Sequence, residues 1–354
     1  MSQESKQLQE KAQKVSQPWT AKRVLDIFLN NALLILMVLA VIVIAIINPN
    51  FIKPSSIFNI IAQTAAYLPV ALGVAGCIVL TGTDLSAGRI VGITACVSAS
   101  LLQALDAANK MWNIPPLPIP VVILIAAVLG GAIGAFNGFF VAKFKLHPFI
   151  VTLGSQLIIY TMLLMYVKMG NKKGMAISGL DSSYSGFITG SWVAKLGGPN
   201  IPNYVWMVVV LVAIMWFIWN KTTFGKNMFA LGANEEAARV SGVNVFATTI
   251  MVFALAGIMY SFTGFIEGAR IAANTANTGL NYELDGIAAC VIGGVSFVGG
   301  IGKISGVIIG VIMLRLIFVG LNMVGINQDL FYVIKGGIIL FACALDMRKY
   351  LVKK

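Results

Sequence analysis

The sequence predicts an all-α membrane protein, a polytopic helical bundle of about ten transmembrane helices. Hydrophobic residues make up 58% of the 354 residues and charged residues only 11%, whereas a soluble domain carries about 25% charge. Apolar windows of bilayer-spanning length, about 20 residues each, recur along nearly the whole chain. The polar stretches between these windows are short. No segment is therefore large enough for a soluble catalytic domain.

Ten apolar windows follow one another along the chain. The third and the eighth are short for a full crossing, and each adjoins a glycine-rich polar segment. In a helical bundle this pattern indicates a broken or tilted helix that lines a cavity. The order helix, glycine-rich break, helix occurs in residues 60–104 and again in 285–322, which suggests an internal repeat. The windows are 25–47, 60–80, 90–104, 117–142, 148–167, 203–220, 246–266, 286–299, 304–322 and 329–345.

The basic residues predict the orientation of these windows. With ten crossings, the side that holds both chain ends carries more than twice as many Lys and Arg residues as the other side, with Arg89 counted on the richer side. The positive-inside rule places that side in the cytoplasm. We therefore expect a cytoplasmic tail at 1–24, a transmembrane domain at 25–346 and a second cytoplasmic tail at 347–354. No cleavable signal peptide is evident.

The remaining composition argues against two other classes of function. The net charge of +12 lies in loops between spans and in the tails, so membrane lipid is the expected partner and nucleic acid is not. Four cysteines stand singly in apolar runs, and His147 is the sole histidine. We expect no metal site and no catalytic cluster in this chain.

The polar loop at 220–245 carries the signals of a short helix outside the bilayer. Asn234 is a good N-cap, and Glu235 and Glu236 place negative charge at the positive helix end. Gly242 suits the stop. Ala237 and Ala238 are strong helix formers between these ends, and Arg239 suits the later turn. We expect an amphiphilic helix of about two turns at 234–242, which a partner groove can grip.

These residues resemble a known family. Glu236-Ala237-Ala238 followed by Gly242 resembles the EAA–G motif of ATP-binding cassette (ABC) importer permeases, whose coupling helix docks on an ATPase subunit. Further blocks are similar to the ribose/galactose/xylose branch, and most of all to its galactose/methyl-galactoside permeases. The similarity covers nearly the whole chain from about residue 25. The blocks are GTDLSAGR (82–89), NGFFVAKFKLHPFIVTLG (137–154), LGANEEAARVSGVNV (231–245), NYELDGIAACVIGGVSFVGG (281–300) and IKGGIILFACALD (334–346).

The resemblance implies a permease subunit of a monosaccharide importer in the bacterial cytoplasmic (inner) membrane. It implies the vitamin-B12-type importer fold, with both termini in the cytoplasm, and two permease copies as a homodimer. The implied partners are an ABC ATPase subunit, which would bind ATP and magnesium, and a periplasmic or lipid-anchored sugar-binding protein. The permease itself would bind no cofactor and catalyse no covalent step.

Polar side chains at membrane depth are costly unless they are paired or used. Asp84 and Ser86 could cap the helix that follows them or line a sugar pathway. The other candidates could offer hydrogen bonds to sugar hydroxyls or hold helices together. They are Asn137, Thr152, Asn274, Asn277 and Asn281.

Charged residues near the spans allow further expectations. Glu283 and Asp285 precede the eighth window, where they could cap its helix or contact a sugar-binding protein. Glu267 and Arg270 are three residues apart and are expected to form a local pair. Arg315 and Lys335 fall within spans, where they are expected to snorkel or to pair inside the bundle.

Several rival functions remain open. An ion-coupled secondary sugar transporter would need titratable acids deep in the bundle, whereas most acids here are expected at span ends or in loops. A membrane enzyme would need a catalytic cluster, and a channel would need no cytoplasmic helix. The run GGIGKIS (299–305) resembles the end of a phosphate loop, but Phe297 and Ile304 stand where Gly and Ser or Thr are required. The sugar also stays open among galactose, glucose, ribose, xylose, a furanose and a nucleoside.

Overall fold

The computed structural model describes residues 32–169 and 174–351. Within these residues every regular element is a helix, and β-pairing is limited to two isolated bridges, Gln103 with Leu180 and Ile177 with Asn274. The prediction of an all-α chain is confirmed for this part of the sequence. The expected tail at 1–24 lies outside the described residues.

Each of the ten predicted windows falls at least partly on a helix. Among the described residues, six helices are long and apolar enough to cross a membrane, namely α4, α6, α7, α10, α13 and α15, while α3, α5 and α16 contain shorter apolar stretches. The bounds are α3 Ala32–Ile47, η1 Pro49–Ile52, α4 Pro54–Val79, α5 Ala87–Leu101, α6 Ile119–Phe144, α7 Pro148–Lys168, α8 Ser182–Thr189, α9 Trp192–Lys195, α10 Asn203–Lys221, α11 Thr223–Ala233, α12 Glu235–Val240, α13 Val245–Ile271, α14 Tyr282–Ile292, α15 Ile304–Met323 and α16 Leu330–Leu351.

One predicted boundary is wrong. The eighth window spans 286–299, but α14 starts earlier and ends at Ile292. Residues 293–303 leave the helix because Gly294, Gly299 and Gly300 have positive φ angles, which glycine adopts readily and which a helix excludes. Helix α16 continues to Leu351, so the described part of the expected tail at 347–354 is helical.

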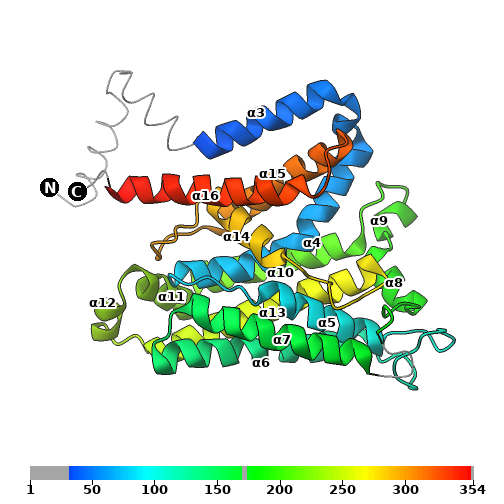
Figure 1. Ribbon diagram of the computed structural model, residues 1–354, viewed down its shortest axis with the longest axis horizontal. Coiled ribbons are helices and arrows are strands. Elements are labelled where there is room, and N and C mark those ends of the chain that lie inside the picture. The colour runs from blue at the N-terminus through cyan, green and yellow to red at the C-terminus, as the bar shows by residue number, and fades with distance from the viewer. Residues whose placement is uncertain (1–31, 170–173, 352–354) are drawn as a thin grey trace.

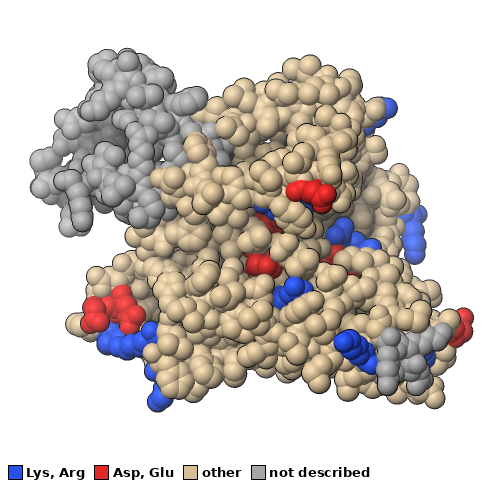
Figure 2. Space-filling view, in the orientation of Figure 1, with Lys and Arg blue, Asp and Glu red and all other residues tan. Residues whose placement is uncertain are grey.

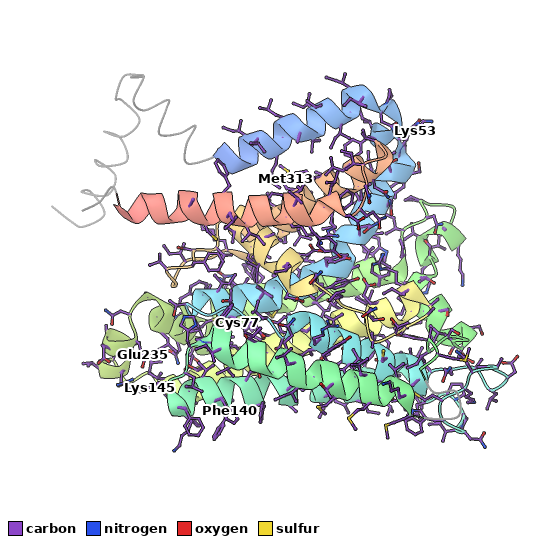
Figure 3. All side chains as sticks on the ribbon, in the orientation of Figure 1. Lys53, Cys77, Phe140, Lys145, Glu235 and Met313 are labelled. Carbon is purple, nitrogen blue, oxygen red and sulfur yellow. The ribbon has the colours of Figure 1, made fainter. Side chains whose placement is uncertain are left out.

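The long helices lie side by side and reverse direction from one to the next (Figure 1). The helix α12 projects from one end of the bundle, and the described end of α16 lies on that same side. The helices α8 and α9 and the connection from α3 to α4 lie at the opposite end. Figure 3 shows Lys145 and Glu235 at the first end and Lys53 at the second. We call these the α12 end and the α9 end.

Helix α13 is the centre of the bundle and packs against α4, α5 and α6. Its Phe253 and Tyr260 are completely buried. The contact with α6 is close because Gly130, Gly134 and Gly138 recur at every fourth position and meet the α13 backbone. Such stripes of small residues allow membrane helices to approach closely.

The outer helices expose apolar side chains in a broad zone between the two ends. In α6 and α7 only 28% of the most apolar window is buried, and exposed residues there include Leu124, Val128 and Leu157. Charged side chains on the visible face gather mainly toward the ends, with a few between them (Figure 2). A surface of this kind is suited to contact with lipid.

Candidate functional site

Helix α12 forms as its sequence predicts because its first turn is capped. The Asn234 side chain accepts a hydrogen bond from the Ala237 amide at 2.9 Å. Glu235 and Glu236 occupy the first turn and Arg239 the last. The guanidinium of Arg239 lies 2.5 Å from the Glu235 carboxylate and 3.8 Å from that of Glu236. Since these side chains are exposed, the ion pairs add little stability and the cap contributes more.

The far end of α12 is fixed by a left-handed glycine. Gly242 has a φ of +85°, and the Val243 amide donates back to the Ala238 carbonyl at 3.0 Å. Ala238 is buried and anchors the inner face, whereas Val240 is 89% exposed. Asn234 and Gly242 thus flank the helix as expected, but α12 itself spans only Glu235–Val240 and is shorter than the expected 234–242. Val240 is an apolar surface that sequence reasoning missed, although its position in the helix could have indicated it.

The segment just before α12 rests on the end of α4 and on the glycine-rich break at 293–303. The Gly300 amide, from the break at 293–303, donates to the carbonyl of Val79 at the end of α4 at 2.9 Å. A side chain at Gly232, in the last turn of α11, would collide with that same carbonyl and with Gly300. The segment that leads into α12 is therefore packed against both the end of α4 and the break at 293–303.

A hollow of about 640 Å³ lies beside this segment. Its lining includes Asn234 and Glu235 from α12 and its cap, and Lys145 and His147 from the connection between α6 and α7. The hollow is thus open to water-soluble groups at the α12 end and carries both signs of charge.

Four of the predicted pathway residues meet in one buried cluster. The Asp84 carboxylate accepts hydrogen bonds from the amide and the hydroxyl of Ser86, at 2.9 and 2.6 Å. The Asn137 side chain donates to the Ser86 hydroxyl at 2.9 Å. Thr152 accepts from the Leu85 amide at 3.1 Å. These contacts tie the break at 80–86 to α6 and α7.

The burial of this cluster favours a structural role over contact with a solute. Asp84, Ser86, Asn137 and Thr152 have no exposed surface. Asp84 forms a turn just before α5, but neither Asp84 nor Ser86 caps the helix with its side chain, so the capping interpretation is wrong. In this conformation the four side chains hold helices together and cannot touch a sugar.

The other three predicted pathway residues lie elsewhere, before α14. The Asn274 side chain donates to the Gly268 carbonyl at 2.8 Å and is buried. Asn277 is exposed, and Asn281 stands at the start of α14 with a φ of +64°. The structure does not bring these residues to the Asp84 cluster.

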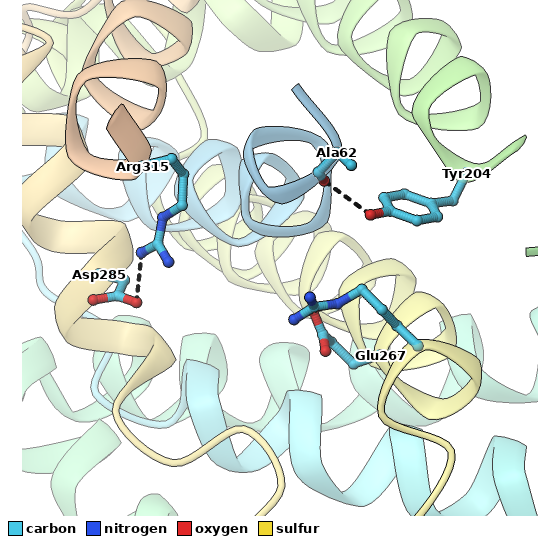
Figure 4. Close-up of polar contacts among 6 residues, drawn as sticks. Ala62, Tyr204, Glu267, Asp285 and Arg315 are labelled. Atoms are coloured by element: carbon cyan, nitrogen blue, oxygen red, sulfur yellow. Dashed lines mark hydrogen bonds and ion pairs between the residues drawn. The ribbon is translucent and has the colours of Figure 1, made fainter. Parts of the chain in front are cut away.

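A second polar site joins α14, α15 and α16. Asp285 lies 2.7 Å from the Arg315 guanidinium and 2.6 Å from the Lys335 ammonium. The guanidinium also stacks over the Tyr67 ring at 3.7 Å. Figure 4 shows Arg315 reaching from its helix to Asp285. The expectation that Arg315 and Lys335 pair inside the bundle is confirmed.

The expected docking role of Glu283 and Asp285 is not supported. Both residues are only 4% exposed, so neither presents a surface to a binding protein in this conformation. The expected pair of Glu267 and Arg270 is confirmed at 2.9 Å, with the Glu267 side chain fully buried. Arg89, which was counted on the cytoplasmic side, is 8% exposed and donates to the Ala276 carbonyl inside the protein.

These positions correct one sequence argument against an ion-coupled transporter. Asp84, Glu267, Glu283 and Asp285 are buried acids, not residues of exposed loops. The error arose because the segments before α5 and α14 fold into the bundle instead of lying outside it. Two of these acids are paired with Arg or Lys, which offsets the cost of their burial.

A cavity of about 410 Å³ opens beside the Asp285 site. Asp285, Arg315 and Lys335 lie in its lining together with Gln63 and Tyr67 of α4. Asn59, Asn322 and Gln328, which are exposed, lie where α4 begins, where α15 ends and just before α16. These helix termini belong to the α9 end (Figure 1).

An apolar helical bundle with a capped helix projecting from one end is the architecture of a membrane permease. Residues 56–343 match the family described as the permease component of the branched-chain amino acid transport system. The chain belongs to this permease family.

Individual relatives cover nearly the full length of both chains. The galactose/methyl galactoside import permease MglC of Escherichia coli is 46% identical over 90% of this chain and 94% of its own. The protein of that name from Haemophilus influenzae is 41% identical over 93% and 97%. The ribose import permease RbsC of E. coli is 33% identical over 89% and 93%. No solved structure matches the chain.

Proposed function

We propose that this chain is the membrane permease of an ATP-driven importer for a monosaccharide of the galactose or methyl galactoside type. The observation that carries the proposal is the similarity, over nearly the full length, to permeases named for those sugars. The family description refers to amino acids, so the choice of sugar rests on the relatives. The more distant similarity to a ribose permease supports a monosaccharide in general.

The proposal assigns the chemistry to partner proteins. An ABC ATPase binds ATP and magnesium and docks on α12 at the cytoplasmic face, and a sugar-binding protein delivers the sugar at the α9 end. Two copies of the permease form the assembly in the bacterial inner membrane. The resemblance that implies these partners also implies the vitamin-B12-type fold. The permease contributes a gated route and no covalent step.

The geometry suggests how force passes from α12 into the bundle. A rigid, capped helix moves as one body. The residue Gly232, just before this helix, lies against the end of α4 at Val79 and against the break at 293–303. A break between helices absorbs backbone rotation more readily than a continuous helix does. Motion of the ATPase subunits is thereby converted into rearrangement of the helices that follow each break.

Substitutions in α12 test the coupling role. Glu236→Lys places positive charge at the positive helix end, and a leucine at Gly242 strains its left-handed backbone. Both variants should insert normally into the membrane but lose about tenfold or more of galactose uptake, because docking is impaired. Uptake of labelled galactose and membrane abundance are measured together.

A matched control is Gly242→Asn, because asparagine tolerates the left-handed backbone that leucine strains. It should leave transport unchanged. Normal uptake in both α12 variants would contradict the docking role. An ion-coupled secondary transporter is the alternative, and the buried acids are the observation that keeps it in view. Uptake that survives ATP depletion and collapses with an uncoupler would replace the ABC proposal by this alternative.

A further inference from the structure

We infer that the cavity beside Asp285 is the site at which the permease receives the sugar from outside. This inference rests on the proposed function and gives it a location. The cavity lies at the beginning of α4, the end of α15 and the beginning of α16. The opposite end of α4, at Val79, contacts the segment just before α12 at Gly232. If α12 faces the cytoplasm, the cavity faces the outside.

The size of the cavity suits one monosaccharide. Its volume of about 410 Å³ falls within the range of about 300–1,000 Å³ that is typical of small-molecule sites. Asn59 at its mouth and Tyr67 at its floor are two turns apart on α4, which corresponds to a depth of about 12 Å along the helix axis. A hexose can enter such a cavity, whereas a bulky polymer cannot.

The lining matches the chemistry of a neutral polyol. A sugar hydroxyl both donates and accepts, so it needs donors and acceptors side by side. The cavity provides the amide of Gln63, the carboxylate of Asp285 and the cations Arg315 and Lys335. Two cations share this one carboxylate, so it does not use all of their N–H groups. The Lys335 side chain is 14% exposed and can donate to a sugar hydroxyl.

Aromatic rings supply the apolar part of the site. Phe318 and Phe331, both in the lining, stack with ring centroids 5.3 Å apart. The C–H face of a sugar ring can pack on such a surface while its hydroxyls point to the polar groups. Neither feature is present in the Asp84 cluster, which has no exposed surface. The structure thus moves the site of sugar contact away from the residues that the sequence singled out.

Cysteine protection tests this inference on the complete importer in cells. Gln63→Cys places a thiol in the cavity, and a membrane-impermeant thiol reagent is applied from outside. Labelling is expected, and saturating D-galactose should slow it about threefold or more, because an occupied site excludes the reagent. An equal osmotic concentration of glycine betaine should not slow it. The unmodified chain sets the background, because Cys77, Cys96 and Cys290 are buried but Cys343 is partly exposed.

Asn50→Cys is the matched control, since Asn50 is exposed at the same end but outside the cavity lining. It should be labelled whether or not galactose is present. The inference fails if the Gln63→Cys variant is not labelled while the Asn50→Cys variant is, or if galactose gives the thiol in the cavity no protection. It also fails if galacturonate protects and galactose does not, because the site would then select an anion.

A transport assay separates this inference from the proposed function. Gln63→Leu should lower galactose uptake per ATP hydrolysed by about tenfold through loss of a hydrogen bond to the sugar. Asn220→Leu makes the same change at an exposed position at the other end of the bundle and should have no effect. If the unmodified importer carries galactose but Gln63→Leu is equally active, the cavity assignment alone is wrong. If the unmodified importer carries no sugar, the proposed function itself is wrong.

Discussion

Asp285 is a carboxylate that two cations from different helices share. Arg315 comes from α15 and Lys335 from α16, and all three side chains are largely buried. A buried charge that loses its partner costs far more than an exposed one, because no water replaces the partner. The residue therefore fixes the relative positions of three helices.

Replacement of Asp285 by asparagine should destabilise the protein strongly. The variant leaves two buried cations without a counter-charge, which costs about 3–5 kcal/mol. Lys335→Met is the comparison, because it keeps the pair of Asp285 and Arg315, and it should cost clearly less. Thermal unfolding of the purified variants measures both effects. Equal melting temperatures for Asp285→Asn and the unmodified chain would show that the network carries no stability.

At the scale of elements, the close contact of α6 with α13 depends on glycines, which have no side chain to hold the two helices apart. An added methyl group at Gly134 would overlap the Phe253 carbonyl of α13. The helices meet backbone to backbone at this point, and dispersion contacts of this kind replace the hydrophobic effect within a bilayer.

Gly134→Val should therefore push α6 away from α13. Forcing extra volume into a close-packed site typically costs about 1–3 kcal/mol. Gly154→Val on α7 is the control, since no atom lies within 4 Å of a side chain built there. The two variants are compared by thermal unfolding and by the amount of folded protein in the membrane. A Gly134→Val variant as stable as Gly154→Val would contradict the tight packing.

Elements whose signals are local could be predicted from the sequence. The cap at Asn234 and the stop at Gly242 act within a few residues, so the sequence predicts the place of α12 to within two residues at each end. The predicted window at 286–299 extends beyond the end of α14, because the mean hydropathy of this stretch is high and does not show that its glycines end the helix. The pairing of Asp285 with Arg315 joins residues thirty positions apart, and no local pattern specifies such a contact. The same reason explains why Asp84 and Thr152 were not predicted to meet.

At the scale of the whole molecule, the alternating helices place α12 and the described end of α16 at one end of the bundle (Figure 1). The long apolar windows predicted this arrangement well, because a bilayer permits few other ways to satisfy the backbone. Which end faces the cytoplasm stays a prediction from the basic residues. Arg89 is buried, so the number of basic residues counted on the cytoplasmic side falls by one. That side still carries more Lys and Arg residues than the other.

Thiol labelling tests the orientation directly. Glu235→Cys should react with an impermeant reagent only when the cytoplasmic side is accessible, as in inverted vesicles. Asn50→Cys should react only from outside in intact cells. Both positions are exposed in this chain, and the labelling uses membranes without the ATPase subunit, which would otherwise cover residue 235. Labelling of residue 235 in intact cells would overturn the topology.

The hollow at the α12 end and the cavity at the α9 end share no lining residue. Between them lies the densely packed interior around Tyr260 and Cys77, both without exposed surface. A solute that enters at one end of a single chain therefore meets a plug of protein, not a continuous pore. Under the proposed function, sugar that enters this cavity can cross only when the helices rearrange, so each transport cycle moves it in a separate step and not by diffusion through an open channel.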